Sequence, residues 1–288
     1  MEEQPAKKAE PAAAPVAHED WEARDKELRK EILRAQLMND TYKLDMCVPL
    51  CLQNLQQAGR SEKEQLAFAK PFWGYSDVRQ LMIDEYERKG QYKKAIAVLN
   101  QSKQFDGGNP RLLFMYRMGL IRIYEARHMK KELKKELLET IHGERAADLN
   151  LTMPLRNLCT PSEWNGYVEQ FVKNGYEGRY ELLLAAEMYG RLWKEIKKSY
   201  DNVELCSRYE RALQGKFGGE ICQYYLDYVG QAAPSVTTLK AGRELMALLE
   251  KAAVYAGGKE KAKALAASLR KEACGNKKLA AVLEEAGY

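Results

Sequence analysis

Cysteine and histidine are the residues of this sequence whose chemistry would suit a metal site or a catalytic centre. Cys47 and Cys51 lie four positions apart, a spacing that places both thiols on one helical face if Pro49 permits a helix there. Zinc needs four ligands. A metal site would need distant cysteines to converge, so buried free thiols that pack as small apolar groups are the better interpretation. No histidine lies near the other four cysteines in the sequence, which are Cys159, Cys206, Cys222 and Cys274.

The three histidines, His18, His128 and His142, supply little material for catalysis. His128 and His142 flank a strongly charged segment at 130–141, and the sequence offers neither of them a partner for acid–base or metal chemistry. A histidine at a helix end interacts favourably with the helix dipole, which accounts for both positions. We therefore predict no catalytic residue, no metal ligand and no cofactor, and hence no enzymatic activity.

Two glycine-rich stretches, at 215–219 and 257–259, have the superficial look of phosphate-binding loops. Such a loop follows a strand and has the pattern G-x-x-x-x-G-K-[ST], and neither condition holds here. Both stretches are better interpreted as turns between helices in which glycine adopts a positive φ.

A basic stretch near the C-terminus is the most distinctive surface feature of the sequence. Residues 259–278 carry seven lysines and arginines against two glutamates, a net charge of +5 that equals that of the whole chain. Lys259, Lys263 and Arg270 share the outward face of a predicted helix, and Lys277 follows it. This face could neutralise phosphates without reading sequence. It could equally be the solvated side of an amphipathic helix, and no aromatic residue lies between the lysines to stack on bases.

The composition predicts a folded protein without a membrane span. The chain has 288 residues, of which 45% are hydrophobic, enough for a core in one or two domains. The longest uncharged run, 46–59, is too short to cross a bilayer, and the N-terminus lacks the apolar segment of a secretory signal. We expect a cytoplasmic protein with reduced thiols. Residues 1–20 are predicted to form a disordered tail before a helical domain at 21–288, which could be divided near 143–160.

The periodicity from residue 21 onward predicts an all-α fold. Apolar residues recur three and four positions apart, no convincing strand is present, and Gly, Asn, Pro or Ser bounds the segments. One such stripe contains Leu28, Ile32, Leu33 and Leu37. We count about a dozen helices joined by short connections. Helices this short must cover one another's apolar faces, which favours stacked helical hairpins, as in an α-solenoid.

One segment resembles the middle of a tetratricopeptide repeat, a pair of antiparallel helices with fixed small and aromatic positions. In that resemblance Gly90 closes the first helix, Tyr92 covers the turn, and Ala95 is the small residue where the helices touch. The early Trp and Leu positions of the repeat are occupied by Arg79 and Met82. Residues 180–197 echo the pattern once more. The matching residues, at the spacing Y-x3-G-x-Y-x2-A-x3-L, are Tyr86, Gly90, Tyr92, Ala95 and Leu99.

The C-terminal third resembles the last helices of bacterial SWIM zinc-finger proteins. The similar features are Gly242-Arg243, the Gly257-Gly258-Lys259 turn, a helix with Leu-Arg near its end, and a short final Leu-rich helix. The finger itself has the pattern Cys-x-Cys followed by Cys-x-His, which this sequence lacks. The resemblance therefore implies the helical scaffold and does not imply zinc binding.

These observations favour a protein–protein interaction or scaffold module that presents a preformed surface to a protein partner. The alternative is a nucleic-acid-associated module, acting beside a separate chain that carries a zinc finger. For that alternative, and for contact with any partner, the candidate binding residues are those of the basic face: Lys259, Lys263, Arg270 and Lys277.

Overall fold

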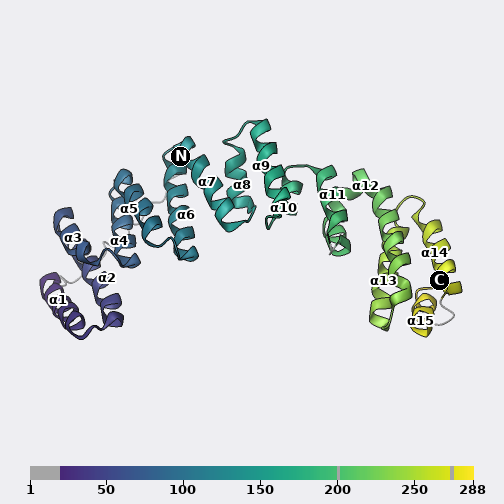
Figure 1. Cartoon of the computed structure of the whole chain (residues 1–288), viewed down its shortest axis with the longest axis horizontal. Helices are drawn as coiled ribbons and strands as arrows, with labels where there is room; N and C mark the ends of the chain where they lie inside the picture. Colours follow the sequence, from purple (N-terminus) through teal and green to yellow (C-terminus); the bar gives the residue numbers. More distant parts are fainter. Residues whose placement is uncertain (1–19, 200–201, 273–275) are drawn as a thin grey trace, which may run out of the picture. The chain divides into compact units, whose positions relative to one another are not determined.

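The computed structural model of this chain describes residues 20–199, 202–272 and 276–288. Within these ranges it contains fifteen α-helices, two short 3-10 helices and no strand (Figure 1). The nearest approach to a sheet is an isolated parallel bridge between Ala146 and Glu177. The predicted all-α class is confirmed, whereas the expected count of about a dozen helices is too low. No helix in the described ranges is long and apolar enough to cross a membrane.

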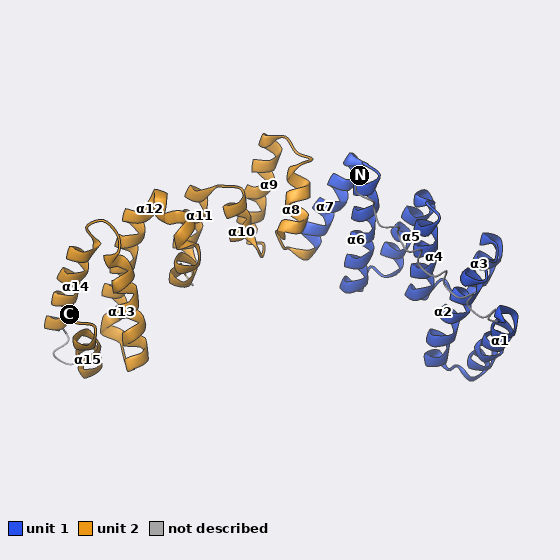
Figure 2. Ribbon diagram, turned by 180° about the vertical axis from the view of Figure 1, so that it is seen from behind, with its two compact units in different colours: residues 1–143 blue, residues 144–288 orange. Residues whose placement is uncertain are grey.

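The chain divides into two compact units, residues 1–143 and 144–288 (Figure 2). The predicted disordered tail, apart from Asp20, lies outside the described residues. Asp20 is the N-cap of the first helix, since its side chain accepts a hydrogen bond from the Ala23 amide. The helices of unit 1 are α1 (Trp21–Met38), α2 (Thr41–Gln57), α3 (Glu62–Ala69), η1 (Lys70–Phe72), α4 (Ser76–Arg88), α5 (Tyr92–Phe105), α6 (Pro110–Ala126) and α7 (Lys130–Glu144).

Helices of unit 1 pack mainly against their neighbours in the sequence. The pairs in contact include α1 with α2, α2 with α3 and α4, α4 with α5, and α5 with α6. The α7 helix is tied to α5 by an ion pair between the Lys103 ammonium and the Glu136 carboxylate, which are 2.7 Å apart. Among the described residues, packing between helices adjacent in the sequence takes the place of packing on a sheet.

Unit 2 follows the same pattern of neighbour packing. Its α10 contacts α8, α9 and α11, α11 contacts α12, and the last four helices α12 to α15 form a connected group. In that group Gly242 allows a close approach: a Cβ there would lie 2.8 Å from the Val282 side chain of α15. The helices are α8 (Leu149–Arg156), α9 (Pro161–Lys173), α10 (Arg179–Ala185), α11 (Tyr189–Lys198), α12 (Asn202–Ala232), η2 (Ala233–Ser235), α13 (Leu239–Ala253), α14 (Gly258–Glu272) and α15 (Lys277–Glu285).

Local capping explains where several helices begin. Thr160 and Glu163 form a capping box at the start of α9, in which the Thr160 hydroxyl accepts from the Glu163 amide and the Glu163 carboxylate accepts from the Thr160 amide. Ser61 and Glu64 form a second capping box at the start of α3. Pro110 occupies the first position of α6, where its missing N–H leaves no hydrogen bond unmade.

Two sequence-based expectations need correction. The short helices α3 and α8 lie in segments where the apolar pattern predicts no helix. The glycines at 215–219 lie around a kink of α12 and none adopts a positive φ, whereas Gly257 does adopt a φ of +71°. At this kink, at Phe217, φ is −126° and ψ is 16°, so that α12 consists of two helices, in agreement with the apolar pattern at 202–213 and 217–232.

The first helix also buries a narrower face than its apolar stripe suggests. Ile32 is buried together with Ala35, whereas Leu33 is 60% exposed and Leu37 is 86% exposed. Because α1 packs chiefly on α2, it has a neighbour for only one of its sides. The predicted stripe at these positions is thus only partly a core stripe.

A fully buried arginine joins three helices of unit 1. The Arg79 guanidinium on α4 donates to the Ser102 hydroxyl at 3.0 Å and to the Trp73 carbonyl at 2.5 Å. It also forms an ion pair with the Asp106 carboxylate. The Tyr116 hydroxyl on α6 donates to the same carboxylate at 2.7 Å, and burial raises the pKa of this tyrosine. The guanidinium therefore connects α4, the end of α5 and α6 through satisfied hydrogen bonds.

Replacing this arginine should loosen α4, α5 and α6 together. In an Arg79→Met variant the Asp106 carboxylate loses its ion pair and keeps only the Tyr116 hydroxyl, and the Trp73 carbonyl loses its donor. We expect a loss of about 3 kcal/mol in the free energy of opening. Hydrogen exchange of the amides of α4 to α6, followed by mass spectrometry, measures this quantity. The matched control is Arg88→Met on the same helix; the Arg88 side chain is 66% exposed, and its loss should change the protection of these amides little. Equal protection in the two variants would contradict a joining role for Arg79.

Candidate functional site

The residues of the predicted repeat junction lie where α4 meets α5. Tyr86, Ala95 and Leu99 are buried, with 4%, 0% and 2% of their surface exposed. Gly90 lies in the turn between the helices with a φ of +69°, a conformation that strongly favours glycine. Tyr92, the first residue of α5, is half-buried. All five therefore lie in α4, in α5 or in the turn that joins these two helices.

A groove with an apolar lining lies between α4 and α6, with α5 beneath it. Its volume is about 430 Å³. The floor depends on Gly119, because a Cβ at this position would lie only 3.2 Å from the Leu99 side chain of α5. Glycine thus lets α6 approach α5 closely and leaves space above the contact. The lining residues are Gln80, Ile83, Glu87, Leu99, Phe114, Met115, Met118, Gly119 and Arg122.

The wall of this groove carries apolar side chains that the fold leaves uncovered. Phe114 is 38% exposed and Met115 is 47% exposed, and the half-buried Met118 lies one helical turn further along α6. At the rim, the Arg122 guanidinium bridges to both oxygens of the Glu87 carboxylate at 2.7 and 2.8 Å. An apolar wall beside a charged rim can accept an apolar side chain and orient the chain that carries it.

The sequence pattern does not single out Phe114 and Met115, although it contains a signal. Four consecutive apolar residues occupy 112–115, more than the one face that a helix can turn toward its core. Some of them had to face elsewhere. Periodicity alone does not show which ones, because that depends on the side from which α5 packs against α6.

The predicted basic face is exposed as expected. Lys259, Lys263 and Arg270 lie on α14, Lys277 is the first residue of α15, and all four are exposed. The inner side of α14 is formed by Ala262, Ala266 and Leu269, which are buried. Lys259, Lys263 and Arg270 therefore share one surface of α14, whereas Lys277 lies on the next helix.

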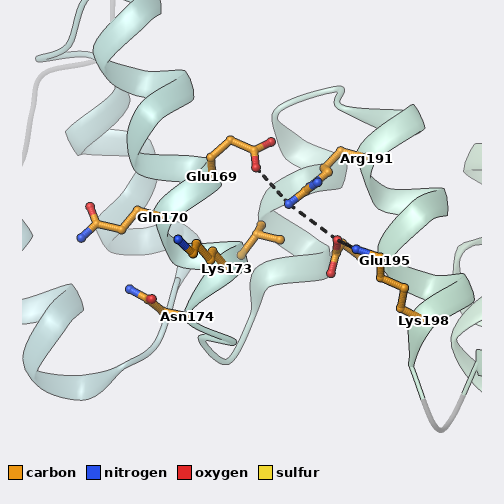
Figure 3. Close-up of a pocket in the computed structure, with 8 residues that line it drawn as sticks. Glu169, Gln170, Lys173, Asn174, Arg191, Glu195 and Lys198 are labelled. Carbon is orange, nitrogen blue, oxygen red and sulfur yellow. Dashed lines mark hydrogen bonds and ion pairs between the residues drawn. The ribbon is translucent and has the colours of Figure 1, made fainter.

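A polar groove in unit 2 lies between α9 and α11 and encloses about 670 Å³. Figure 3 shows Arg191 between two glutamates: its guanidinium lies 2.9 Å from the Glu169 carboxylate and 3.6 Å from that of Glu195. Lys198 also pairs with Glu195, at 3.3 Å. Because these charges neutralise one another, the groove holds α9 against α11 and offers little free charge or apolar surface to a ligand.

The described cysteines are buried or half-buried free thiols and do not form a cluster. Cys51, Cys206 and Cys222 are buried, and Cys47 and Cys159 are half-buried. Burial raises the pKa of Cys51 to about 12, with the nearby Asp25 carboxylate adding to the rise, and it raises that of Cys206 to about 11. Cys274 lies outside the described residues. Within the described ranges no three Cys, His, Asp or Glu side chains are grouped so that they could hold a metal.

The two histidines near α7 lie at helix ends. His128 is exposed just after α6 with a φ of +54°, and His142 lies in the last turn of α7. The last turn of a helix is a favourable position for a protonated histidine, because the carbonyl end of the dipole is negative. Neither side chain lines one of the grooves described above.

No known family model matches this sequence, and neither does any curated protein. The resemblances to the tetratricopeptide repeat and to SWIM zinc-finger proteins therefore rest on the residues that carry them. The groove and the basic face are interpreted from their own geometry and charge.

The raised pKa values predict slow thiol modification in the folded protein. At pH 8 we expect iodoacetamide to label Cys51 and Cys206 at least about tenfold more slowly than Cys47 and Cys159, because the thiolate is the reactive form and burial disfavours it. Peptide mass spectrometry over a time course measures each rate. Labelling in 6 M guanidinium chloride is the control, where all rates should converge. Rapid labelling of Cys206 in the folded chain would contradict its buried placement.

Proposed function

We propose that this chain is a non-catalytic protein–protein interaction or scaffold module of the cytoplasm, built from stacked helical hairpins of tetratricopeptide-like type. Support for the stacking comes from the neighbour packing of α4, α5 and α6 and from the turn at Gly90. A row of such hairpins forms an α-solenoid, whose surface exists before a partner arrives. This arrangement suits binding better than catalysis.

The groove between α4 and α6 is the observation that supports this proposal most directly. Phe114, Met115 and the half-buried Met118 line one wall of a concave groove, and apolar side chains gathered in a groove with a polar rim mark interaction sites. The occupant we assign is an apolar side chain of a partner polypeptide, whose burial would contribute about 1.5–3 kcal/mol. Methionine side chains are flexible, so the wall can adapt to the shape of that side chain. The Glu87–Arg122 pair at the rim would hydrogen-bond to the backbone of the partner.

A random peptide library tests this proposal while the partner is still unidentified. We expect the full chain to enrich, from a phage-displayed library, peptides with a shared aromatic or branched aliphatic position. Synthetic versions of these peptides should bind a Met115→Glu, Met118→Glu variant at least about tenfold more weakly, because carboxylates would occupy the apolar wall. Fluorescence anisotropy measures the dissociation constants, and circular dichroism confirms that the variant is helical.

The matched control places two carboxylates on exposed apolar positions away from the groove. Leu37 and Met38 on α1 are 86% and 80% exposed, so a Leu37→Glu, Met38→Glu variant carries the same change in the same unit. Peptide binding should survive in this control. If the library yields no shared apolar position, or if both variants lose binding equally, the groove is not the binding site.

The exposed basic residues of α14 and α15 support a second candidate function. In this alternative the chain is a nucleic-acid-associated module related to SWIM zinc-finger proteins, with the finger supplied by another chain. Lysine and arginine heads on one helical surface can neutralise phosphates, and the affinity would fall as salt rises. The basic face would then be Lys259, Lys263, Arg270 and Lys277.

A gel-shift assay at low salt separates the two candidates. If nucleic acid is the ligand, the protein should shift a DNA duplex, and a Lys263→Glu, Arg270→Glu variant should abolish the shift. A Lys194→Glu, Arg211→Glu variant makes the same charge change at two exposed positions of unit 2 and serves as the control. Absence of any shift at low salt would eliminate this candidate.

A further inference from the structure

A second cavity of unit 1 lies beside the turn between α4 and α5. It encloses about 490 Å³ and is separate from the apolar groove, with which it shares no lining residue. The start of α5 forms one side, and the residues between α6 and α7 form the other. The lining residues are Gly90, Gln91, Tyr92, Lys93, Lys94, Ile96, Arg127 and Met129.

The charged side chains that line this cavity are all cationic. Lys93, Lys94 and Arg127 contribute three positive charges, and no carboxylate is among the lining residues. Lys94 is already neutralised, since its ammonium lies 2.6 Å from the Glu62 carboxylate. Lys93 and Arg127 have no ion pair with any described residue. The cavity therefore has two cations whose charge is available to a ligand.

The position of these lysines indicates that their charge serves something other than helix stability. Lys93 and Lys94 lie in the first turn of α5, which contains no acidic residue. The amino end of a helix is positive, so cations in its first turn are disfavoured. Lys130 and Lys131 also lie in the first turn of an α-helix, α7, although that turn contains Glu132 as well; they follow the lining residue Met129 directly, and both are exposed. An anionic ligand at this cavity would relieve the repulsion.

The rest of the lining is apolar and suits a side chain. Tyr92 presents a ring against which the Arg127 guanidinium lies, 5.2 Å from the ring centroid. Ile96 and Met129 are half-buried beside it. This combination of an apolar lining with cations can bury one apolar side chain while it neutralises carboxylates on either side of it.

We propose that this cavity binds an acidic segment of a partner polypeptide, in which an apolar side chain enters the cavity and flanking Asp or Glu residues pair with Lys93 and Arg127. A nucleic acid fits the cavity less well, because the single lining aromatic, Tyr92, already has Arg127 against its ring and leaves little free face for a base. The inference names a second contact site beyond the groove and does not depend on the groove being occupied.

The test uses the full chain and a labelled peptide with a central leucine flanked by two glutamates on each side. We expect saturable binding by fluorescence anisotropy that weakens as NaCl rises from 50 to 500 mM, because the charges are exposed. A Lys93→Glu, Arg127→Glu variant should bind at least about tenfold more weakly, since like charges would then face one another. The affinity of the milder Lys93→Gln, Arg127→Gln variant should lie between that of the charge-reversal variant and that of the unaltered chain.

Two control variants locate the effect. Lys26→Glu with Arg111→Glu makes the same charge change at exposed positions of unit 1 that line neither cavity, and it should alter the affinity less than about twofold. The groove variant Met115→Glu, Met118→Glu should likewise keep its affinity for this peptide. If the groove proposal fails, the binding of the acidic peptide at the cavity is therefore unaffected. If the cavity proposal fails, the binding of library peptides at the groove is likewise unaffected.

Control ligands decide between the classes of partner. Replacing the central leucine of the peptide by serine should weaken binding, and a peptide with lysines in place of glutamates should not bind. The inference is overturned if the acidic peptide does not bind, if both charge-reversal variants lose affinity equally, or if serine substitutes for leucine without loss. It is also overturned if a twelve-nucleotide DNA strand binds more tightly than the peptide and depends on Lys93 and Arg127.

Discussion

No helix of this protein can bury its apolar face alone, and that constraint shapes both units. The part of the chain that the structure describes has no sheet to pack on, so each helix must use the helices next to it in the sequence, as α4, α5 and α6 do. An interior helix then has two neighbours, whereas α1 packs chiefly on α2 and leaves Leu37 86% exposed. The same constraint produces the groove, because α4 and α6 both pack on α5 and leave Phe114 and Met115 uncovered.

Both proposed binding sites of unit 1 are lined in part by helices that the polar contacts of Arg79 hold together. Arg79 occupies a position where the repeat pattern has an aromatic residue, and it joins α4 to α5 and α6 through Ser102, Asp106 and Tyr116. A guanidinium offers five donors in fixed directions, so it sets the relative placement of the helices more narrowly than an apolar contact would. The groove and the cationic cavity both draw lining residues from these helices.

The sequence predicted those features that local chemistry decides. The start of α6 at Asn109-Pro110 and the Thr160–Glu163 capping box at the start of α9 can be read from the sequence, because a cap or a proline acts within one turn. The eight-residue α3 and α8 escaped prediction, since two helical turns hold too few residues to show a period. The exposure of Phe114 and the cavity at Arg127 were not predicted either, because both depend on how separate helices approach one another in space.

The network around Arg79 has a consequence for how the chain is made. The Tyr116 hydroxyl that shares its carboxylate lies 37 positions later in the sequence. During synthesis α4 is therefore made before Asp106 and Tyr116, the residues that compensate and share the charge of Arg79. Until those residues are made, the Arg79 guanidinium is exposed to water. A shortened chain that ends before Asp106 would keep α4 and most of α5 but would leave the guanidinium without its carboxylate. Boundaries for a fragment of unit 1 should accordingly be drawn after α6, where the charge is compensated.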